Sequence, residues 1–162
     1  MWQIREWQVE DVEVFCSIWN EVVESGDYYM GEEALSYDEM KDMCQKQTRV
    51  CCVVNEQGIV GGFYILHPNQ IGRGAHIANA TYAVDKKFRG CGLGRILVKD
   101  SISKAKAYGF KGFQFNAVVA TNKFAIKLYR KLGFNIIGVV PEAFKLKSGE
   151  LTDLYIMFMN LK

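Results

Sequence analysis

The sequence contains no run of about 18 apolar residues, the shortest stretch that crosses a bilayer as a helix, so it predicts no membrane span. Its first fifteen residues carry charges throughout and lack the basic-then-apolar order of a secretory signal. It also has no internal repeat, low-complexity tract or linker. With 49% apolar and 23% charged residues, we expect one soluble, cytoplasmic domain over residues 1–162, long enough to bury a core.

Candidate metal ligands and disulfide partners are also scarce. The cysteines are odd in number and show no C-x-x-C spacing: Cys16, Cys44, Cys51, Cys52 and Cys91. Cys51 and Cys52 are neighbours in a strand-like run, so their side chains should point to opposite faces of a sheet. The only histidines are His67 and His76, and neither is close in sequence to Cys91. We therefore expect no disulfide and no metal site, and we interpret Cys91 as a small residue in a tight loop rather than a nucleophile.

A net charge of +2 conceals an uneven distribution. Residues 1–60 contain thirteen acidic and four basic residues, a balance of −9, whereas residues 85–131 contain twelve basic and two acidic residues, a balance of +10. The basic half has no aromatic-interleaved basic motif and no recognition-helix pattern, so we expect a polyphosphate ligand rather than a nucleic acid. The acidic half either attracts a cationic substrate such as an amine or forms a solvated helix surface.

The most informative stretch runs from Ala80 to Tyr108. An apolar strand, Ala80–Val84, leads into a basic loop with glycines at 90, 92 and 94, and the loop leads into a helix. Glycine allows backbone conformations that expose N–H groups, and such groups at a helix N-terminus attract phosphate. Four cations surround this loop: Lys86, Lys87, Arg89 and Arg95. The stretch predicts an anion-binding cradle, with a simple glycine-rich turn as the alternative.

Two nucleotide motifs do not fit this loop. It lacks a third glycine at the spacing of the G-x-G-x-x-G fingerprint, and no Gly-Lys-Ser/Thr marks a P-loop. The segment Arg89-Gly90-Cys91-Gly92-Leu93-Gly94 instead resembles the Q/R-x-x-G-x-G/A signature of the GCN5-related N-acetyltransferases (the GNAT family), in which it holds the pyrophosphate of acetyl-CoA. A second segment, from Asn122 to Phe134, resembles the family's N-x-x-A-x-x-L-Y-x-x-x-G-F motif.

Hydrophobic periodicity gives an order of elements that agrees with this resemblance. The predicted strands are 2–7, 50–54, 59–66, 75–84, 112–119, 134–140 and 154–158, and the predicted helices are 10–24, one starting at 36, 93–108 and 121–131. Thr121 is predicted to cap the last helix, and Pro141 is placed in a loop. The resemblance implies the GNAT fold, an α/β (α+β) arrangement with a central mixed, mostly antiparallel sheet of roughly seven strands, splayed in the middle, and roughly four helices.

The resemblance also implies a cofactor site. Backbone groups of Tyr82, Ala83 and Val84 would meet the pantetheine arm and the acetyl group where two strands splay apart. The residues implied to bind the pyrophosphate are Arg89, Gly90, Cys91, Gly92, Leu93, Gly94 and Arg95. Asn122 is implied to contact the cofactor, and Tyr129 is the implied catalytic residue that protonates the departing CoA thiolate. Without the motif, Asn122 would be interpreted as a helix cap and Tyr129 as a packed aromatic.

The acceptor side carries fewer signals. Asn79, Asn116 and Tyr28 are candidate substrate-binding residues, although strand asparagines also bond within a sheet. Residues 79–84, 115–119 and 141–144 look like those of small-molecule amine acetyltransferases of the phosphinothricin or azetidine-carboxylate kind. Ala117 occupies the position of a glutamate that some N-terminal acetyltransferases carry, so the general base is not identified. The remaining candidates for the base are a water chain or one of Glu24, Asp27, Glu32 and Glu33.

We therefore predict an acetyl-CoA-dependent N-acetyltransferase that acetylates a primary amine of a small molecule or amino acid by direct attack. A protein N-terminal or lysine acetyltransferase of the same fold is one alternative, and a non-catalytic CoA-binding sensor or interaction module is another. We expect no metal, no membrane and no nucleic-acid partner. A homodimer is expected because exposed C-terminal strands often pair in this family.

Overall fold

The computed structural model describes residues 1–162 as seven strands and four α-helices. The strands are β1 (Gln3–Glu6), β2 (Arg49–Val54), β3 (Val60–Pro68), β4 (Ile77–Val84), β5 (Gly112–Val119), β6 (Asn135–Lys145) and β7 (Leu151–Asn160). The helices are α1 (Val12–Ser25), α2 (Tyr37–Lys46), α3 (Leu93–Ala107) and α4 (Lys123–Lys131). None of these helices is long and apolar enough to cross a membrane.

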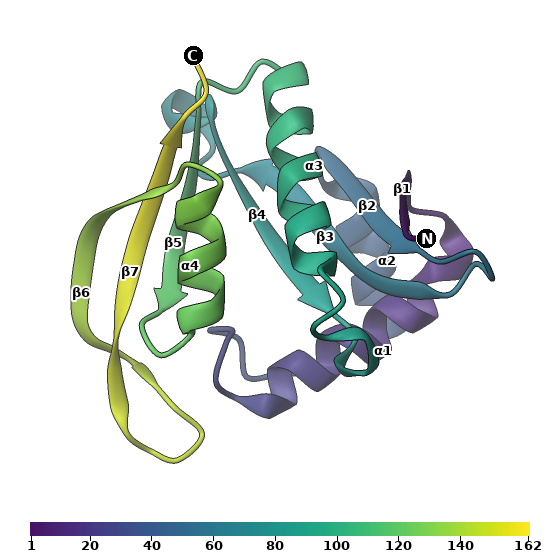
Figure 1. Ribbon diagram of the computed structural model, residues 1–162, viewed down its shortest axis with the longest axis horizontal. Helices are drawn as coiled ribbons and strands as arrows, with labels where there is room; N and C mark the ends of the chain where they lie inside the picture. The colour runs from purple at the N-terminus through teal and green to yellow at the C-terminus, as the bar shows by residue number, and fades with distance from the viewer.

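All seven strands form one sheet in the order β1-β2-β3-β4-β5-β7-β6 (Figure 1). Neighbouring strands are antiparallel except β4 and β5, which are parallel and pair only at Ile77–Gly112 and Ala78–Phe113. Beyond those two pairs the strands diverge, because each remains paired on its other side, β4 with β3 and β5 with β7. The predicted fold is confirmed, including the opening in the middle of the sheet.

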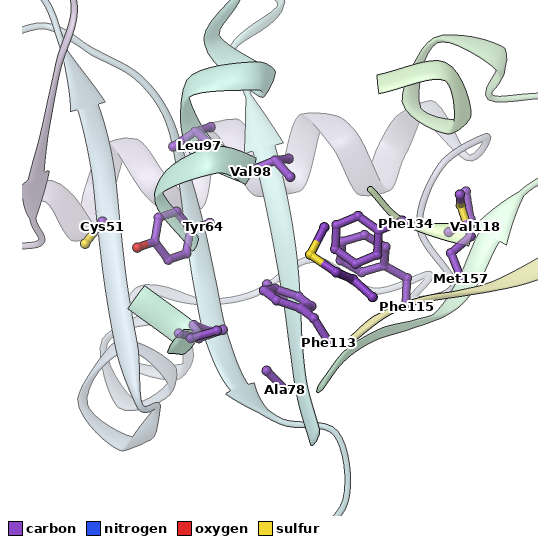
Figure 2. Close-up of a cluster of buried hydrophobic side chains, with 14 of the residues drawn as sticks. Cys51, Tyr64, Ala78, Leu97, Val98, Phe113, Phe115, Val118, Phe134 and Met157 are labelled. Carbon is purple, nitrogen blue, oxygen red and sulfur yellow. The ribbon is translucent and has the colours of Figure 1, made fainter. Parts of the chain in front are cut away.

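Two hydrophobic clusters hold helices on opposite faces of the sheet. On the first face, α3 and α4 cover a cluster that includes Leu97, Phe113 and Phe134 (Figure 2). On the second face, α1 and α2 cover a cluster in which the rings of Phe15 and Phe63 stack with centroids 4.1 Å apart. Cys51 belongs to the first cluster and Cys52 to the second, as their adjacent positions predicted. These layers fix the positions of β4 and β5 between them.

The structure corrects predicted boundaries at β7, which runs over Leu151–Asn160 rather than 154–158, and at β6 and α4. β6 continues past Val140 through Pro141 to Lys145, because β6 is an edge strand and a register shift between Val140 and Phe144 accommodates the missing N–H of proline. The cap of α4 is Asn122 rather than Thr121, and its side chain accepts a hydrogen bond from the backbone N–H of Ala125 at 3.3 Å. The helix-capping interpretation of Asn122 is therefore correct, although Asn122 also faces the pocket described below.

One buried carboxylate, Asp11, ties β1 to the start of α1. Its oxygens accept hydrogen bonds from the guanidinium of Arg5 at 2.7 and 2.9 Å and from the backbone N–H of Gln8 at 2.7 Å. Burial on its own would raise the pKa of this carboxyl, but the bonds from Arg5 and Gln8 outweigh burial and hold the pKa of Asp11 below its ordinary value of 3.8.

Asp11→Asn is expected to lower the free energy of unfolding by about 2 kcal/mol at pH 7, because the amide removes the counter-charge of Arg5 and replaces one of its two acceptor oxygens with a donor. The pKa of Asp11 is lower in the folded chain than in the unfolded chain. The contribution of the carboxylate is therefore complete above about pH 4 and disappears as the pH falls through the folded pKa. Urea unfolding at a series of pH values measures this difference, and an equal difference at neutral and acid pH would contradict it.

Candidate active site

The gap between β4 and β5 exposes unpaired backbone groups. Asp85 N–H donates to Gly61 O, and Asn69 N–H donates to Ile77 O, at the two ends of the β3–β4 pairing. These bonds show that the odd-numbered residues of β4 are the ones whose backbone groups bond to β3. Since strand residues alternate, the backbone groups of Tyr82 and Val84 point away from β3 and into the gap. The backbone of Ala83 points to β3 instead. Of the three backbone contacts that the resemblance implied, the geometry supports Tyr82 and Val84 and does not support Ala83.

The glycine loop at the end of β4 is an open cradle. Gly90 and Gly92 have φ angles of 83° and 79°, in the left-handed region that favours glycine. Of residues 89–95, only Cys91 donates its backbone N–H within the protein, to Phe88 O at 3.3 Å. The other N–H groups have no partner, and residues 89–92 are exposed at the start of α3. The loop leads into a 15-residue helix, and unpaired amides at a helix N-terminus can bind an anion.

The cations around the cradle are free except for Arg89. Its guanidinium lies 3.3 Å from a carboxylate oxygen of Glu21 on α1. This pair is partly exposed, with 47% of the Arg89 side chain and 29% of the Glu21 side chain accessible. Such a pair contributes little to stability. Arg89 can therefore turn towards a bound anion at small cost.

A pocket of about 230 Å³ fills the opening between the two strands. It brings together six of the predicted site residues: Tyr28, Asn79, Tyr82, Asn116, Asn122 and Tyr129. Trp19 from α1 and the loop residues Tyr29 and Met30 also line it, and no charged side chain does. Trp19 is 4% exposed, packs in the second cluster and also forms part of the pocket wall.

Tyr129 directs its hydroxyl into this pocket. Its ring packs against Phe115, with 4.4 Å between centroids, and against Tyr82 and Phe134. The hydroxyl makes no hydrogen bond in the protein. Every fully buried side-chain polar atom has a hydrogen-bond partner, so this unpaired hydroxyl must be accessible from the pocket. Burial raises the pKa of Tyr129. The phenol therefore keeps its proton throughout the neutral range, as a proton donor must.

Three asparagines bridge the opening at the end where β4 and β5 part. The side-chain oxygen of Asn69 accepts from Asn79 Nδ2 at 3.1 Å and from Asn116 Nδ2 at 2.7 Å. Asn79 Oδ1 accepts from the backbone N–H of Ala80 at 2.8 Å, which fixes the orientation of the whole network. Asn116 Oδ1 accepts from Gln114 Nε2 at 3.0 Å. No sequence pattern marks Asn69, and only its place opposite Ile77 at the end of β3 could have suggested it.

The carboxylates that were candidate bases do not line the pocket. Glu24, Glu32 and Glu33 are exposed to solvent. Asp27 accepts a hydrogen bond from the backbone N–H of Lys147 at 3.0 Å, which ties the β6–β7 loop to the end of α1. Ala117, at the position where some relatives carry a glutamate, is a pocket residue with no titratable group.

The chain resembles known proteins along most of its length. Residues 5–134 match the acetyltransferase (GNAT) family. N-acetyltransferase aca1 of Schizosaccharomyces pombe is 32% identical over 155 residues, which cover 85% of this chain and 74% of that protein. A GCN5-related N-acetyltransferase from Kribbella flavida superposes with a TM-score of 0.93 and 34% identity, covering 98% of this chain and 97% of that one.

A phosphinothricin acetyltransferase from Sinorhizobium meliloti, described in complex with AcCoA, superposes with a TM-score of 0.91. It is 21% identical, with 98% of this chain and 88% of that chain covered, so this likeness concerns the fold. The family match, in contrast, covers both of the motifs that carried the resemblance. This chain belongs to the acetyltransferase (GNAT) family and, as its sequence predicted, is an N-acetyltransferase.

Proposed function

We propose that the chain transfers the acetyl group of acetyl-CoA to the primary amine of a small α-amino acid by direct attack. The observation that carries this proposal is the continuity of the site, in which the amide cradle, the unpaired edge of β4 and the pocket follow one another. The cradle amides would hold the diphosphate, and the backbone of Tyr82 and Val84 would hold the pantetheine arm. The acetyl-CoA complex of the S. meliloti protein, which has the same fold, supports this choice of cosubstrate.

The residues at the end of this path suit acyl transfer. Attack of an amine on a thioester places negative charge on the carbonyl oxygen, and an N–H already aimed into the gap, such as that of Val84, would stabilise it. Tyr129 would donate its phenolic proton to the departing sulfur. The two walls of the gap hold both reactants in line, which supplies much of the remaining rate enhancement.

The asparagine network favours an acceptor that carries a carboxylate. The side-chain oxygens of Asn69, Asn79, Asn116 and Asn122 all accept hydrogen bonds within the protein. Their Nδ2 groups keep free N–H donors, one each on Asn79 and Asn116 and two on Asn122, and these donors match the oxygens of an anion. The pocket has no carboxylate to hold a polyamine. An α-amino acid satisfies the donors at one end and presents its amine to the gap.

A protein substrate fits the pocket less well. Tyr28, Tyr29 and Met30 line the acceptor side of the pocket, and the neighbouring Asp27 accepts a hydrogen bond from the backbone N–H of Lys147 at 3.0 Å. A peptide acceptor would need a groove open at both ends. Because these side chains occupy the side along which a peptide chain would continue, they favour a free amino acid over a protein N-terminus or lysine.

The acceptor preference can be tested with amino acids and their decarboxylated counterparts. Release of free thiol from acetyl-CoA should be at least tenfold faster with L-leucine, L-methionine or L-phenylalanine than with 3-methylbutylamine, 3-(methylthio)propylamine or 2-phenylethylamine, because only the amino acids engage the asparagine donors. Asn116→Ala should remove that preference. Equal rates for each pair would overturn the carboxylate proposal, and faster release with peptides would favour the protein-modifying alternative. Tight CoA binding without thiol release from any acceptor would favour the sensor.

A further inference from the structure

The proposed reaction leaves one proton without a destination, and this inference rests on that function. An amine with a pKa of about 10 arrives as an ammonium and loses two protons when it becomes an amide. One of the two is balanced by the proton that Tyr129 supplies to sulfur as the C–S bond breaks. The other must leave the site before or during formation of the C–N bond. The pocket contains no carboxylate and no histidine that could accept it directly.

A second cavity of about 150 Å³ adjoins the first and shares two of its lining residues, Trp19 and Thr81. Its other lining residues are Met43, Gln47, Ile65 and His67. Gln47, Thr81 and His67 give it three polar side chains, enough partners for ordered water, and its volume exceeds the share of about 30 Å³ that one water occupies in the liquid. Thr81 is therefore the one hydroxyl-bearing side chain that lines both the acceptor pocket and the second cavity.

His67 has a proton-accepting nitrogen free on this side. Its Nδ1 lies 2.8 Å from the carbonyl oxygen of Pro68, and because a carbonyl oxygen only accepts, Nδ1 carries the hydrogen. In the neutral ring Nε2 then keeps its lone pair, and Nε2 has no partner in the protein. His67 also pairs with Asn79 across β3 and β4, so the two side chains are neighbours on one face of the sheet. Its half-buried position leaves a route to solvent.

We propose that His67 accepts the excess proton of the acceptor amine through Thr81 and water in the second cavity. The ammonium gives a proton to water or to the hydroxyl of Thr81, and that hydroxyl passes its own proton through water to Nε2 of His67. The amine lone pair is thereby freed to form the C–N bond. Imidazolium at His67 then releases the proton to solvent, and the neutral ring is restored with Nδ1–H still donated to Pro68. No oxidant, reductant or further reactant is required.

The test measures thiol release with whichever of L-leucine, L-methionine and L-phenylalanine reacts fastest. His67→Ala should lower kcat/KM for that amino acid about 100-fold, within the range for a lost general base, and leave the Kd for acetyl-CoA unchanged. Because the substitution enlarges the cavity, added imidazole should restore activity about tenfold. Thr81→Val should show a similar loss, whereas Thr81→Ser, which keeps the hydroxyl, should be nearly as active as the parent. His76→Gln alters the other histidine, which is exposed, and is the matched control.

The outcomes separate this inference from the function on which it rests. No turnover by the parent protein with any acceptor would overturn the proposed function and this inference together. Full activity of His67→Ala in an active parent would overturn the inference alone. A third outcome would also overturn it: His67→Ala loses activity, imidazole does not restore that activity, and His67→Gln is fully active. Because glutamine can still donate to the carbonyl of Pro68, this result would mean that the histidine only supports the loop.

Discussion

Tyr129→Phe is expected to lower kcat about 100-fold while the Kd for acetyl-CoA stays within a factor of two of the parent value. General acids contribute about 10² to 10⁴ in rate, and removal of this hydroxyl takes away the proposed proton donor to the departing sulfur. The ring itself remains, so its packing against Phe115, Tyr82 and Phe134 is kept. Pre-steady-state thiol release and calorimetric binding of acetyl-CoA together measure both quantities.

The pH dependence gives a second check on Tyr129. Since burial raises the pKa of this phenol, its proton is retained as the pH rises past the ordinary value of 10.0. Ionisation of Tyr129 should therefore not lower the kcat of the parent between pH 7 and pH 9.5. Over that range the ratio of the parent kcat to the Tyr129→Phe kcat should stay constant. Tyr37→Phe alters an exposed tyrosine on α2 and serves as the control. An unchanged kcat in Tyr129→Phe would show that sulfur takes its proton from elsewhere, and Tyr129 would then be a packing residue.

The parts of the fold that the sequence could predict are those that local patterns determine. The apolar runs of β2 and β3, the apolar faces of α1 and α3 and the start of α2 after Ser36 depend only on neighbouring residues. The extension of β6 through Pro141 was missed because proline is tolerated there only by virtue of the edge position, which is a property of the whole sheet. Similarly, Thr121 and Asn122 are both good caps, and the geometry of the turn after β5 decides between them.

The site was predictable where a motif marks it and unpredictable where contacts between distant segments create it. The glycine loop, Asn122 and Tyr129 lie in short motifs, and the structure brings the last two to one pocket. Asn69 and His67 lie at the end of β3, in a stretch without any pattern. Their proximity to the site follows from the register that pairs His67 with Asn79 and from the loop bond between Asn69 and Ile77. A strand pairing predicted from the sequence would have placed His67 beside Asn79, but it would not have revealed the second cavity that Trp19 lines.

Gly92→Asp is expected to weaken acetyl-CoA binding at least 100-fold. Gly92 is the N-cap of α3, with a φ of 79° and no other atom within 4 Å of the place that a Cβ would occupy, so a small side chain has room there. Asp tolerates the left-handed conformation at a cost of about 1 kcal/mol, and the fold should survive. Its carboxylate, however, would stand beside the site for a diphosphate. Two unit charges about 5 Å apart repel by about 3 kcal/mol at an effective dielectric constant of about 20, which is more than two powers of ten in Kd.

Gly92→Asn isolates the contribution of charge, because it has the same shape and the same tolerance of positive φ as aspartate. We expect Gly92→Asn to bind acetyl-CoA within about fivefold of the parent and Gly92→Asp to bind far more weakly, although Gly92→Asp should be at least as thermally stable because the helix dipole favours its carboxylate. Dephospho-CoA, which lacks the 3′-phosphate but keeps the diphosphate, should show the same ratio between the two variants. If both variants lost affinity equally, shape rather than charge would govern this loop, and if neither did, the diphosphate would have to lie away from the N-terminus of α3.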